Sequence, residues 1–268
     1  MMFLFDTHAH LDQIEDIESA LKDAVAAGVK GILAVGVDLA SNKKNLQIKT
    51  FSTLLNIDLA FGIHPGEIKA EEIDETLAFM RENREEMTAV GEIGLDYWYK
   101  GVKKDPQQKA LQKDVFVRQL EMAGEFGLPV TIHSRGAWQD CFDLTRAAGL
   151  KKAVFHWYSG PVDILDKILE AGFYISATPS LATSPQAREA VSHAPLERIL
   201  VETDSPVFYR CPGEEGGFRA QPKDVLRTLN FLSELKGRQP QDMHDRLNTN
   251  AREVLGMNAG SPPTKGLL

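Results

Sequence analysis

Hydrophobic residues along the chain gather in eight short runs that have the character of buried strands. The runs cover residues 3–11, 31–38, 59–65, 88–96, 128–135, 152–159, 173–180 and 198–206. Between them apolar residues recur at helical spacing, as at Ile14, Ile17, Leu21 and Ala24. Near-continuous apolar strands are typical of a parallel sheet that is covered on both faces. The pattern therefore predicts strands that alternate with helices, followed after about residue 206 by two further helical segments.

Eight strand–helix units in about 250 residues match the (β/α)8 TIM barrel in number and in length. A doubly wound open sheet is the structural alternative, but the chain lacks the GxGxxG and GxxxxGK[ST] phosphate-binding loops that would favour it. We therefore predict an α/β fold with a single TIM-barrel domain over residues 1–257. The tail over residues 258–268 is rich in Gly, Pro and Ser and is expected to be flexible.

The composition of the 268 residues is that of an ordinary globular protein, with 43% hydrophobic and 25% charged residues. The sequence has no basic and apolar leader, and no run of about 18 apolar residues that a membrane-spanning helix needs. Two cysteines, Cys141 and Cys211, are too few for a disulfide framework and fit a reducing compartment. We therefore expect a cytoplasmic protein that does not associate with membranes.

The formal net charge of -8 repels nucleic acid in general. A nucleic-acid substrate would have to be held by a local basic patch or by metal ions. Residues 97–109, YWYKGVKKDPQQK, place three aromatic residues beside four lysines. Single-stranded nucleic acid uses aromatic planes and nearby cations for stacking and phosphate contacts, although a solvated loop explains the lysines equally well.

Polar residues recur at the carboxyl ends of the predicted strands, where barrel enzymes build their active sites. Five of the seven histidines lie there with three carboxylates, and the set is His8, His10, His64, His133, His156, Glu92, Glu202 and Asp204. In the motif DTHAHLD, the two-residue period of a strand points His8 and His10 to one face. Barrel packing gives no reason for this distribution, whereas a metal site needs imidazoles and carboxylates that converge from separate strands. The sequence therefore predicts a metal site.

Six of these residues exceed the ligand set of one tetrahedral zinc ion, namely His8, His10, Glu92, His133, His156 and Asp204. We predict two divalent ions about 3.5–4 Å apart, bridged by a carboxylate and by a water molecule or hydroxide, as in metal-assisted hydrolysis. Asp204 would accept a proton from that water. Mixed histidine and carboxylate ligands suit Zn, Mn, Ni or Co better than Mg, and the sequence does not choose among them.

Seven motifs along the chain occur in the order and at the spacing of one known family: DTHAHLD, GIHP, VGEIGLDYW, QLEMAGEFGLPVTIHSR, FHWYSG, LVETDSP and NTNAREVLG. Over about residues 5–256 the chain resembles the metal-dependent hydrolases of the TatD deoxyribonuclease family, within the amidohydrolase-like barrels. The resemblance implies that His8 and His10 bind one metal ion and that Glu92 bridges it to a second.

The resemblance further implies that His133 and His156 bind the second ion and that Asp204 is a ligand beside the nucleophilic water. Other residues are expected to line the site or to support the ligands: His64, Glu202, Asp6, Asp96, Arg135, Trp98 and Tyr158. For Asp96 and Arg135, a structural salt bridge is an equal alternative. Asp12 is expected to cap a helix that starts near Ile14.

Three stretches depart from the family pattern. HWYSG at residues 156–160 stands where the family commonly has HCFSG, and GIHPGE has Gly66 where the family has a second histidine. After ETDSP, many members carry a stretch rich in Arg and Asn, but this chain has VFYRCPGEEGGFRAQP. None of these three departures alters a predicted metal ligand. Each of them alters residues that are expected to contact the substrate.

These observations predict a metal-dependent hydrolase in which Asp204 and Glu92 are catalytic. The first interpretation is a deoxyribonuclease that cuts DNA phosphodiesters from an exposed end, with no obligate protein partner. A second keeps the metals but changes the bond to an ester or amide, as in an aminoacyl-tRNA deacylase or another amidohydrolase. A third is a barrel that only binds metal or a partner protein, but its expected sign, a lost ligand, is missing from the sequence.

Overall fold

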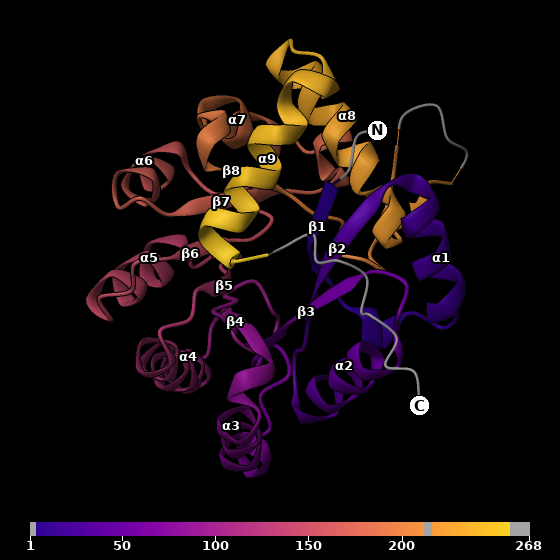
Figure 1. The fold of residues 1–268 in the computed structure, drawn as a ribbon. Helices are drawn as coiled ribbons and strands as arrows, with labels where there is room; N and C mark the ends of the chain where they lie inside the picture. Colours follow the sequence, from indigo (N-terminus) through magenta and orange to yellow (C-terminus); the bar gives the residue numbers. More distant parts are fainter. Residues whose placement is uncertain (1–3, 212–215, 258–268) are drawn as a thin grey trace, which may run out of the picture.

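The computed structural model describes residues 4–211 and 216–257. Its centre is a barrel of eight parallel strands that follow one another in chain order (Figure 1). They are β1 (Leu4–Ala9), β2 (Val29–Val35), β3 (Asn56–Phe61), β4 (Met87–Gly94), β5 (Val130–His133), β6 (Ala153–Phe155), β7 (Tyr174–Ala177) and β8 (Ile199–Val201). The segment after β8 closes the barrel against β1, because the Asp204 amide donates to the His8 carbonyl at 3.0 Å. The predicted TIM barrel is confirmed.

Helices surround the strands on the outside of the barrel (Figure 1). They are α1 (Ile17–Ala27), α2 (Leu39–Phe51), α3 (Ile73–Glu82), α4 (Pro106–Phe126), α5 (Trp138–Ala147), α6 (Val162–Glu170), α7 (Pro185–His193), α8 (Val225–Lys236) and α9 (Pro240–Leu255). The two helical segments predicted after residue 206 are α8 and α9, and a short hairpin of β9 (Phe208–Tyr209) and β10 (Phe218–Arg219) precedes them.

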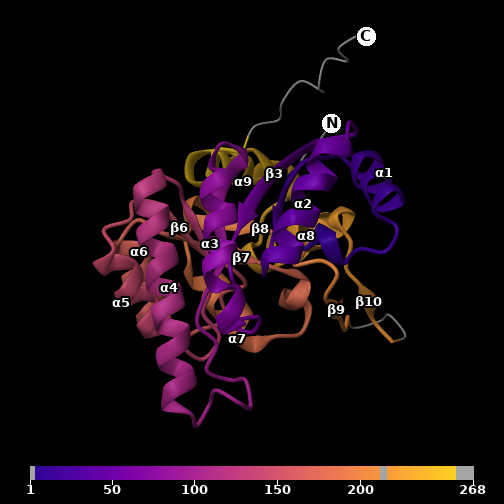
Figure 2. The same ribbon diagram turned by 90° about the horizontal axis from the view of Figure 1, so that it is seen from below.

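Helix α9 closes the amino-terminal end of the barrel. Its residues Ala251, Val254 and Leu255 pack in one buried cluster with Phe5 near the start of β1 and with Tyr174 at the start of β7. Figure 2 shows α9 at one end of the barrel and the beginning of α4 at the other. The carboxyl ends of the strands therefore remain open for a site, as in other barrels of this type.

Side chains at the helix starts explain where several helices begin. Asp105 accepts hydrogen bonds from the amides of Gln107 and Gln108 ahead of α4, and Asp16 accepts one from Ser19 ahead of α1. Such contacts satisfy amide groups that the first helical turn leaves without partners.

The predicted capping role of Asp12 is wrong. A separate 3-10 turn over Leu11–Gln13 follows β1, so α1 starts only at Ile17 and Asp16 caps it. The Asp12 side chain instead lies near Asn45 of α2, with 3.5 Å between Asp12 Oδ1 and Asn45 Nδ2.

The predicted tail over residues 258–268 lies outside the described residues, so a domain boundary at residue 257 stays a prediction. Among the helices of the described part of the chain, none combines the length and the apolar character that crossing a membrane requires.

Candidate metal centre

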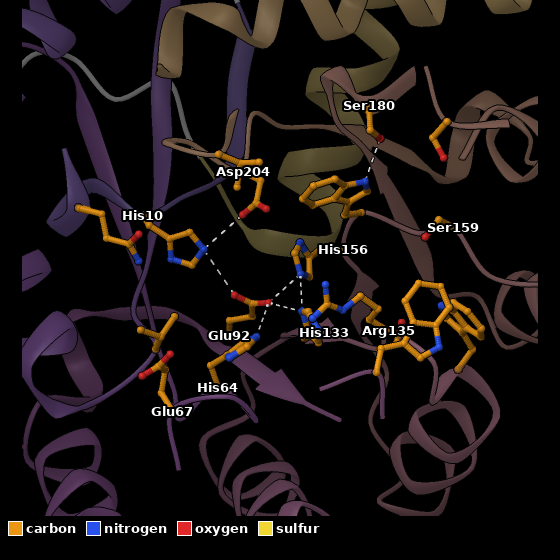
Figure 3. Close-up of a pocket in the computed structure, with 18 residues that line it drawn as sticks. His10, His64, Glu67, Glu92, His133, Arg135, His156, Ser159, Ser180 and Asp204 are labelled. Atoms are coloured by element: carbon orange, nitrogen blue, oxygen red, sulfur yellow. Dashed lines mark hydrogen bonds and ion pairs between the residues drawn. The ribbon is translucent and has the colours of Figure 1, made fainter. Parts of the chain in front are cut away.

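Side chains from five strand ends meet at the carboxyl end of the barrel (Figure 3). All but one of the predicted ligands are buried, and His133 is only slightly more exposed. His8 lies in β1 and His10 follows it, Glu92 lies in β4, His133 ends β5, His156 follows β6, and Asp204 follows β8. The fold thus brings all six residues together from positions almost 200 residues apart.

Glu92 lies between two pairs of imidazoles. Its Oε2 is 3.4 Å from His8 Nε2 and 3.5 Å from His10 Nε2. Its Oε1 is 2.8 Å from His133 Nδ1 and 2.7 Å from His156 Nε2. Each oxygen of one carboxylate therefore faces a different pair of nitrogen atoms.

Asp204 joins the pair of imidazoles from β1. Its Oδ1 lies 3.6 Å from His8 Nε2 and 3.2 Å from His10 Nε2. Asp204 has a φ of 50°, and Trp157, with a φ of 41°, is the other described non-glycine residue with positive φ. Such conformations cost energy and concentrate at functional sites. Here the strained backbone turns the Asp204 carboxylate toward the two histidines.

Hydrogen bonds on the outer side of two imidazoles decide which nitrogen faces the centre. His10 Nδ1 lies 3.1 Å from the Val35 carbonyl, which only accepts, so this nitrogen carries a hydrogen and Nε2 faces the carboxylates of Asp204 and Glu92. His133 Nε2 lies 2.7 Å from Asp96 Oδ2, and its Nδ1 faces Glu92 Oε1 at 2.8 Å. Partners of this kind orient the histidine ligands of metal sites.

The imidazoles of His156 and His8 have longer contacts on their outer side, and the inner nitrogen of His8 has no hydrogen-bond partner among the described residues. His156 Nδ1 lies 3.4 Å from Glu202 Oε1, and His8 Nδ1 lies 3.3 Å from Thr131 Oγ1. On the inner side, His8 Nε2 is buried and has no hydrogen-bond partner within the described residues. Buried polar atoms are normally satisfied. An unpartnered buried nitrogen among imidazoles and carboxylates fits a divalent cation.

Comparison with known proteins agrees with this geometry. Residues 5–256 match the family described as TatD related DNase. The chain belongs to this family. The predicted family and its metal-dependent hydrolase chemistry are thereby confirmed.

Two relatives and one solved structure illustrate the match. The uncharacterized metal-dependent hydrolase YcfH of Escherichia coli (strain K12) is 30% identical over 88% of this chain and 89% of its own length. Human deoxyribonuclease TATDN3 is 26% identical, with 94% of each chain covered. The crystal structure of YJJV, a TatD homolog from Escherichia coli, superposes with a TM-score of 0.84 at 24% identity and covers 95% of this chain and 98% of its own. The TatD barrel is therefore the fold of this chain.

The carboxylates of the centre raise the pKa of two of its histidines, His10 and His156. Burial opposes the charged form of His10, but the hydrogen bond and charge of Asp204, with the charge of Glu92, raise the pKa of His10 to about 9. Burial likewise opposes charge on His156, yet the charge of Glu92 and the hydrogen bond of Glu202 raise its pKa well above the usual value. Protons therefore compete with metal ions for these nitrogens at neutral pH.

Metal binding is expected to release protons and to strengthen as the pH rises. A protonated imidazole has no lone pair for a metal, so an ion must displace the proton from His10, whose pKa in the metal-free protein is about 9. The apparent affinity for Zn²⁺ should therefore rise about tenfold per pH unit for each displaced proton from pH 6 to about 9, and then level off. Calorimetric titration in buffers of different ionisation enthalpy measures the number of protons released.

The control for this titration is His193→Ala, because His193 is an exposed histidine at the end of α7 that pairs with Asp166 of α6, on the outer helices of the barrel. This variant should release the same number of protons as the wild type. An affinity that does not change with pH would contradict the prediction.

His64 lies beside the centre but presents a hydrogen rather than a lone pair. Its Nδ1 accepts from the Gly66 amide at 2.9 Å, so the neutral ring carries its hydrogen on Nε2, which lies 3.6 Å from Glu92 Oε1. Burial, only partly offset by Glu92, lowers the pKa of His64 to about 3, and the ring stays neutral. His64 is therefore a hydrogen-bond donor beside the centre.

A cavity of about 440 Å³ opens above the buried centre (Figure 3). Of the residues predicted to surround the metals, His64, Trp98 and Arg135 line it. Tyr158 does not, because its side chain is buried and its hydroxyl donates to the Pro161 carbonyl at 2.8 Å. The Tyr158 side chain thus supports the loop after β6 instead of facing the cavity.

Three predicted acidic residues also lie outside the cavity lining and hold neighbouring groups. Asp96 accepts from Arg135 Nε at 2.8 Å in addition to its contact with His133, so the salt bridge and the support of the ligand coexist. Glu202 accepts from the Trp157 amide at 3.0 Å. Asp6 accepts from the Thr203 amide at 3.0 Å and ties β1 to the segment after β8.

Sequence reasoning missed several residues of the cavity wall, among them Trp138, Ser134 and Ser180. The only signal in the sequence was that Ser134 lies at the end of the predicted fifth strand and that Trp138 closely follows it, because loops after barrel strands build the mouth. Gly66, where the family pattern has a second histidine, lies against Tyr99. A Cβ at position 66 would lie 2.7 Å from the hydroxyl of Tyr99. Tyr99 therefore occupies the space that a side chain at position 66 would need.

Proposed function

We propose that this chain is a deoxyribonuclease that hydrolyses DNA phosphodiester bonds at two divalent metal ions. The observation that supports the proposal most strongly is the position of Glu92, whose two oxygens face separate pairs of imidazoles. The family match and the human relative named deoxyribonuclease TATDN3 support DNA as the substrate.

In this proposal His8, His10 and Asp204 hold one ion, His133 and His156 hold the other, and Glu92 lies between them. When bound there, the ions would lower the pKa of the attacking water molecule and stabilise charge on the phosphoryl group. Imidazole nitrogens with carboxylate oxygens suit Zn, Mn, Ni or Co better than Mg, which prefers oxygen ligands.

Asp204 is proposed to take the proton from the attacking water. Burial opposes its charged form, but the hydrogen bond and charge of His10 outweigh burial and lower the pKa of Asp204, so the carboxylate is ionised at neutral pH. His64 is proposed to donate from Nε2 toward an oxygen of the substrate.

The size of the cavity supports attack at an end of the strand. A volume of about 440 Å³ corresponds to a site for one ligand of small-molecule size, and the predicted ligands lie buried beneath it. A terminal nucleotide enters such a space more readily than the middle of a duplex. We therefore propose an exonucleolytic enzyme.

The experiment is to measure the metal content of the purified protein and its cleavage of end-labelled single-stranded DNA. We expect about two ions per chain and products shortened by one nucleotide at a time. Chelation should abolish cleavage, and Mn²⁺, Co²⁺ or Zn²⁺ should restore it. Metal without cleavage would contradict the deoxyribonuclease, and the same preparation would then be tested on esters and amides. One ion per chain would contradict the pair, and internal cuts would contradict attack at an end.

A further inference from the structure

One wall of the cavity is aromatic. Trp98, Trp138 and Trp157 all line it. The rings of Trp98 and Trp138 meet edge to face, with 5.8 Å between centroids and an angle of 88° between planes. Trp98 lies beside a polar and buried centre, but it is itself 58% exposed. A large apolar surface left open at a site commonly marks contact with a ligand.

The backbone makes room for both of these rings. Gly136 has a φ of 72°, and a Cβ there would lie 2.3 Å from Trp98 Cδ1. At Gly160 a Cβ would lie 2.7 Å from Trp138 Cδ1. A side chain at either position would push an indole away from its place, so the loops after β5 and β6 are shaped around the pair.

Arg135 adds a positive charge to the same cavity. Among the described residues it is the one arginine or lysine in the lining. Its Nε donates to Asp96, and its guanidinium lies over the ring of Tyr99, 5.0 Å from the centroid. Within the described part of the chain, the structure gives its two terminal nitrogens no hydrogen bond. A guanidinium held by one edge in this way presents the other edge to an anion, and phosphate is a matching partner.

Asp96 connects this cation to the metal centre. Its Oδ2 lies 2.7 Å from His133 Nε2 and 2.8 Å from Arg135 Nε. A phosphate held by Arg135 would therefore be linked through Asp96 to His133, which is a ligand of the proposed second metal site. The chain has a formal net charge of -8, so it needs a local cation of this kind to hold a polyanion.

We propose that Trp98, Trp138 and Arg135 form a subsite for the nucleotide next to the scissile phosphate. The base stacks on the exposed indole of Trp98, which Trp138 holds in place, and Arg135 binds the phosphate of that nucleotide. Because a base inside a duplex is stacked on its neighbours, the subsite selects an unpaired strand end. This inference rests on the proposed function, since it names the part of the substrate that the same site recognises.

The first test separates recognition of the base from chemistry at the phosphate. It compares thymidine 5′-(4-nitrophenyl phosphate), which carries a base, with methyl 4-nitrophenyl phosphate, which does not. Trp98→Ala should lower kcat/KM for the thymidine ester by about 5- to 140-fold, the range for one stacked base, and change the methyl ester by less than about twofold. Trp98→Phe, which keeps an aromatic plane, should retain most of the activity.

Two further variants complete the comparison. Trp138→Ala should also lower kcat/KM for the thymidine ester, because it removes the ring that holds Trp98 in place. Phe51→Ala is the control, because Phe51 is 82% exposed and does not line the cavity. The proposed subsite would be overturned if Trp98→Ala lowered kcat/KM equally for both esters. It would also be overturned if a folded Trp98→Ala variant kept the wild-type kcat/KM for both.

A second test does not depend on catalysis. Metal-free protein in EDTA is titrated against fluorescein-labelled oligothymidylate, with either an intact or an abasic terminal nucleotide, and anisotropy reports binding. The wild type should bind the intact end about 5- to 140-fold more tightly, and Trp98→Ala should lose this preference. Equal binding of both ends by the wild type would overturn the subsite. If the wild type does not cleave end-labelled single-stranded DNA but keeps the preference, the proposed function fails and the subsite stands.

Discussion

Replacing Asp204 with asparagine should lower kcat for DNA end cleavage by about 10²- to 10⁴-fold, the contribution typical of a general base. The amide keeps the size of the side chain and an oxygen toward His10 but accepts no proton from water at neutral pH. The metal content should fall much less than the activity, because Glu92 and the imidazoles remain. Steady-state kinetics at saturating metal, with metal analysis of the same samples, measures the two effects separately.

The matched control is Asp166→Asn, an exposed carboxylate that pairs with His193 on the outside of the barrel. This variant should keep wild-type kcat and metal content. Activity of Asp204→Asn within tenfold of the wild type would remove Asp204 from the proposed proton transfer.

Replacing Glu92 with glutamine should cause the larger loss, about 10⁴-fold or more in kcat, because residues that act as one unit fail together. Each oxygen of Glu92 faces one pair of imidazoles, and glutamine would turn an NH₂ donor toward one of the two pairs. We therefore expect the metal content to fall from about two ions per chain to one or fewer. Inductively coupled plasma mass spectrometry of the dialysed protein measures it.

A surface carboxylate provides the control for the loss of charge. Glu125 is exposed and pairs with Arg81, so Glu125→Gln should leave both metal content and activity unchanged. Glu92→Gln with two bound ions would show that the carboxylate does not bridge them. In that case the two sets of imidazoles would have to hold their ions independently.

The barrel and the convergence of the six proposed ligands at its mouth were predictable because each depends on a local pattern. Apolar runs of strand length mark β1 to β8, and a strand end marks the place where a polar side chain reaches the mouth of a barrel. His8 and His10 share a face through the two-residue period of a strand. The start of α1 was not predictable in this way, because Asp12 and Asp16 are both good capping residues and the turn over Leu11–Gln13 decided between them.

The role of His64 also depended on the structure. The motif GIHP places a histidine at the mouth but does not say which nitrogen carries the hydrogen. The Gly66 amide donates to Nδ1 and leaves the hydrogen on Nε2, so His64 donates where a ligand would have to accept. This contact arises from the fold of one loop, which no spacing in the sequence encodes.

By itself, the sequence determined the barrel, the family and the six residues proposed to bind metal, because periodicity and motif spacing operate over a few neighbouring residues. Only the tertiary structure decided which pair of imidazoles faces each oxygen of Glu92, and that Asp96 joins His133 to Arg135. It alone brought Trp98 and Trp138 edge to face. These contacts join residues that lie far apart along the chain, and their distances depend on the closure of the barrel and the shape of the loops after its strands.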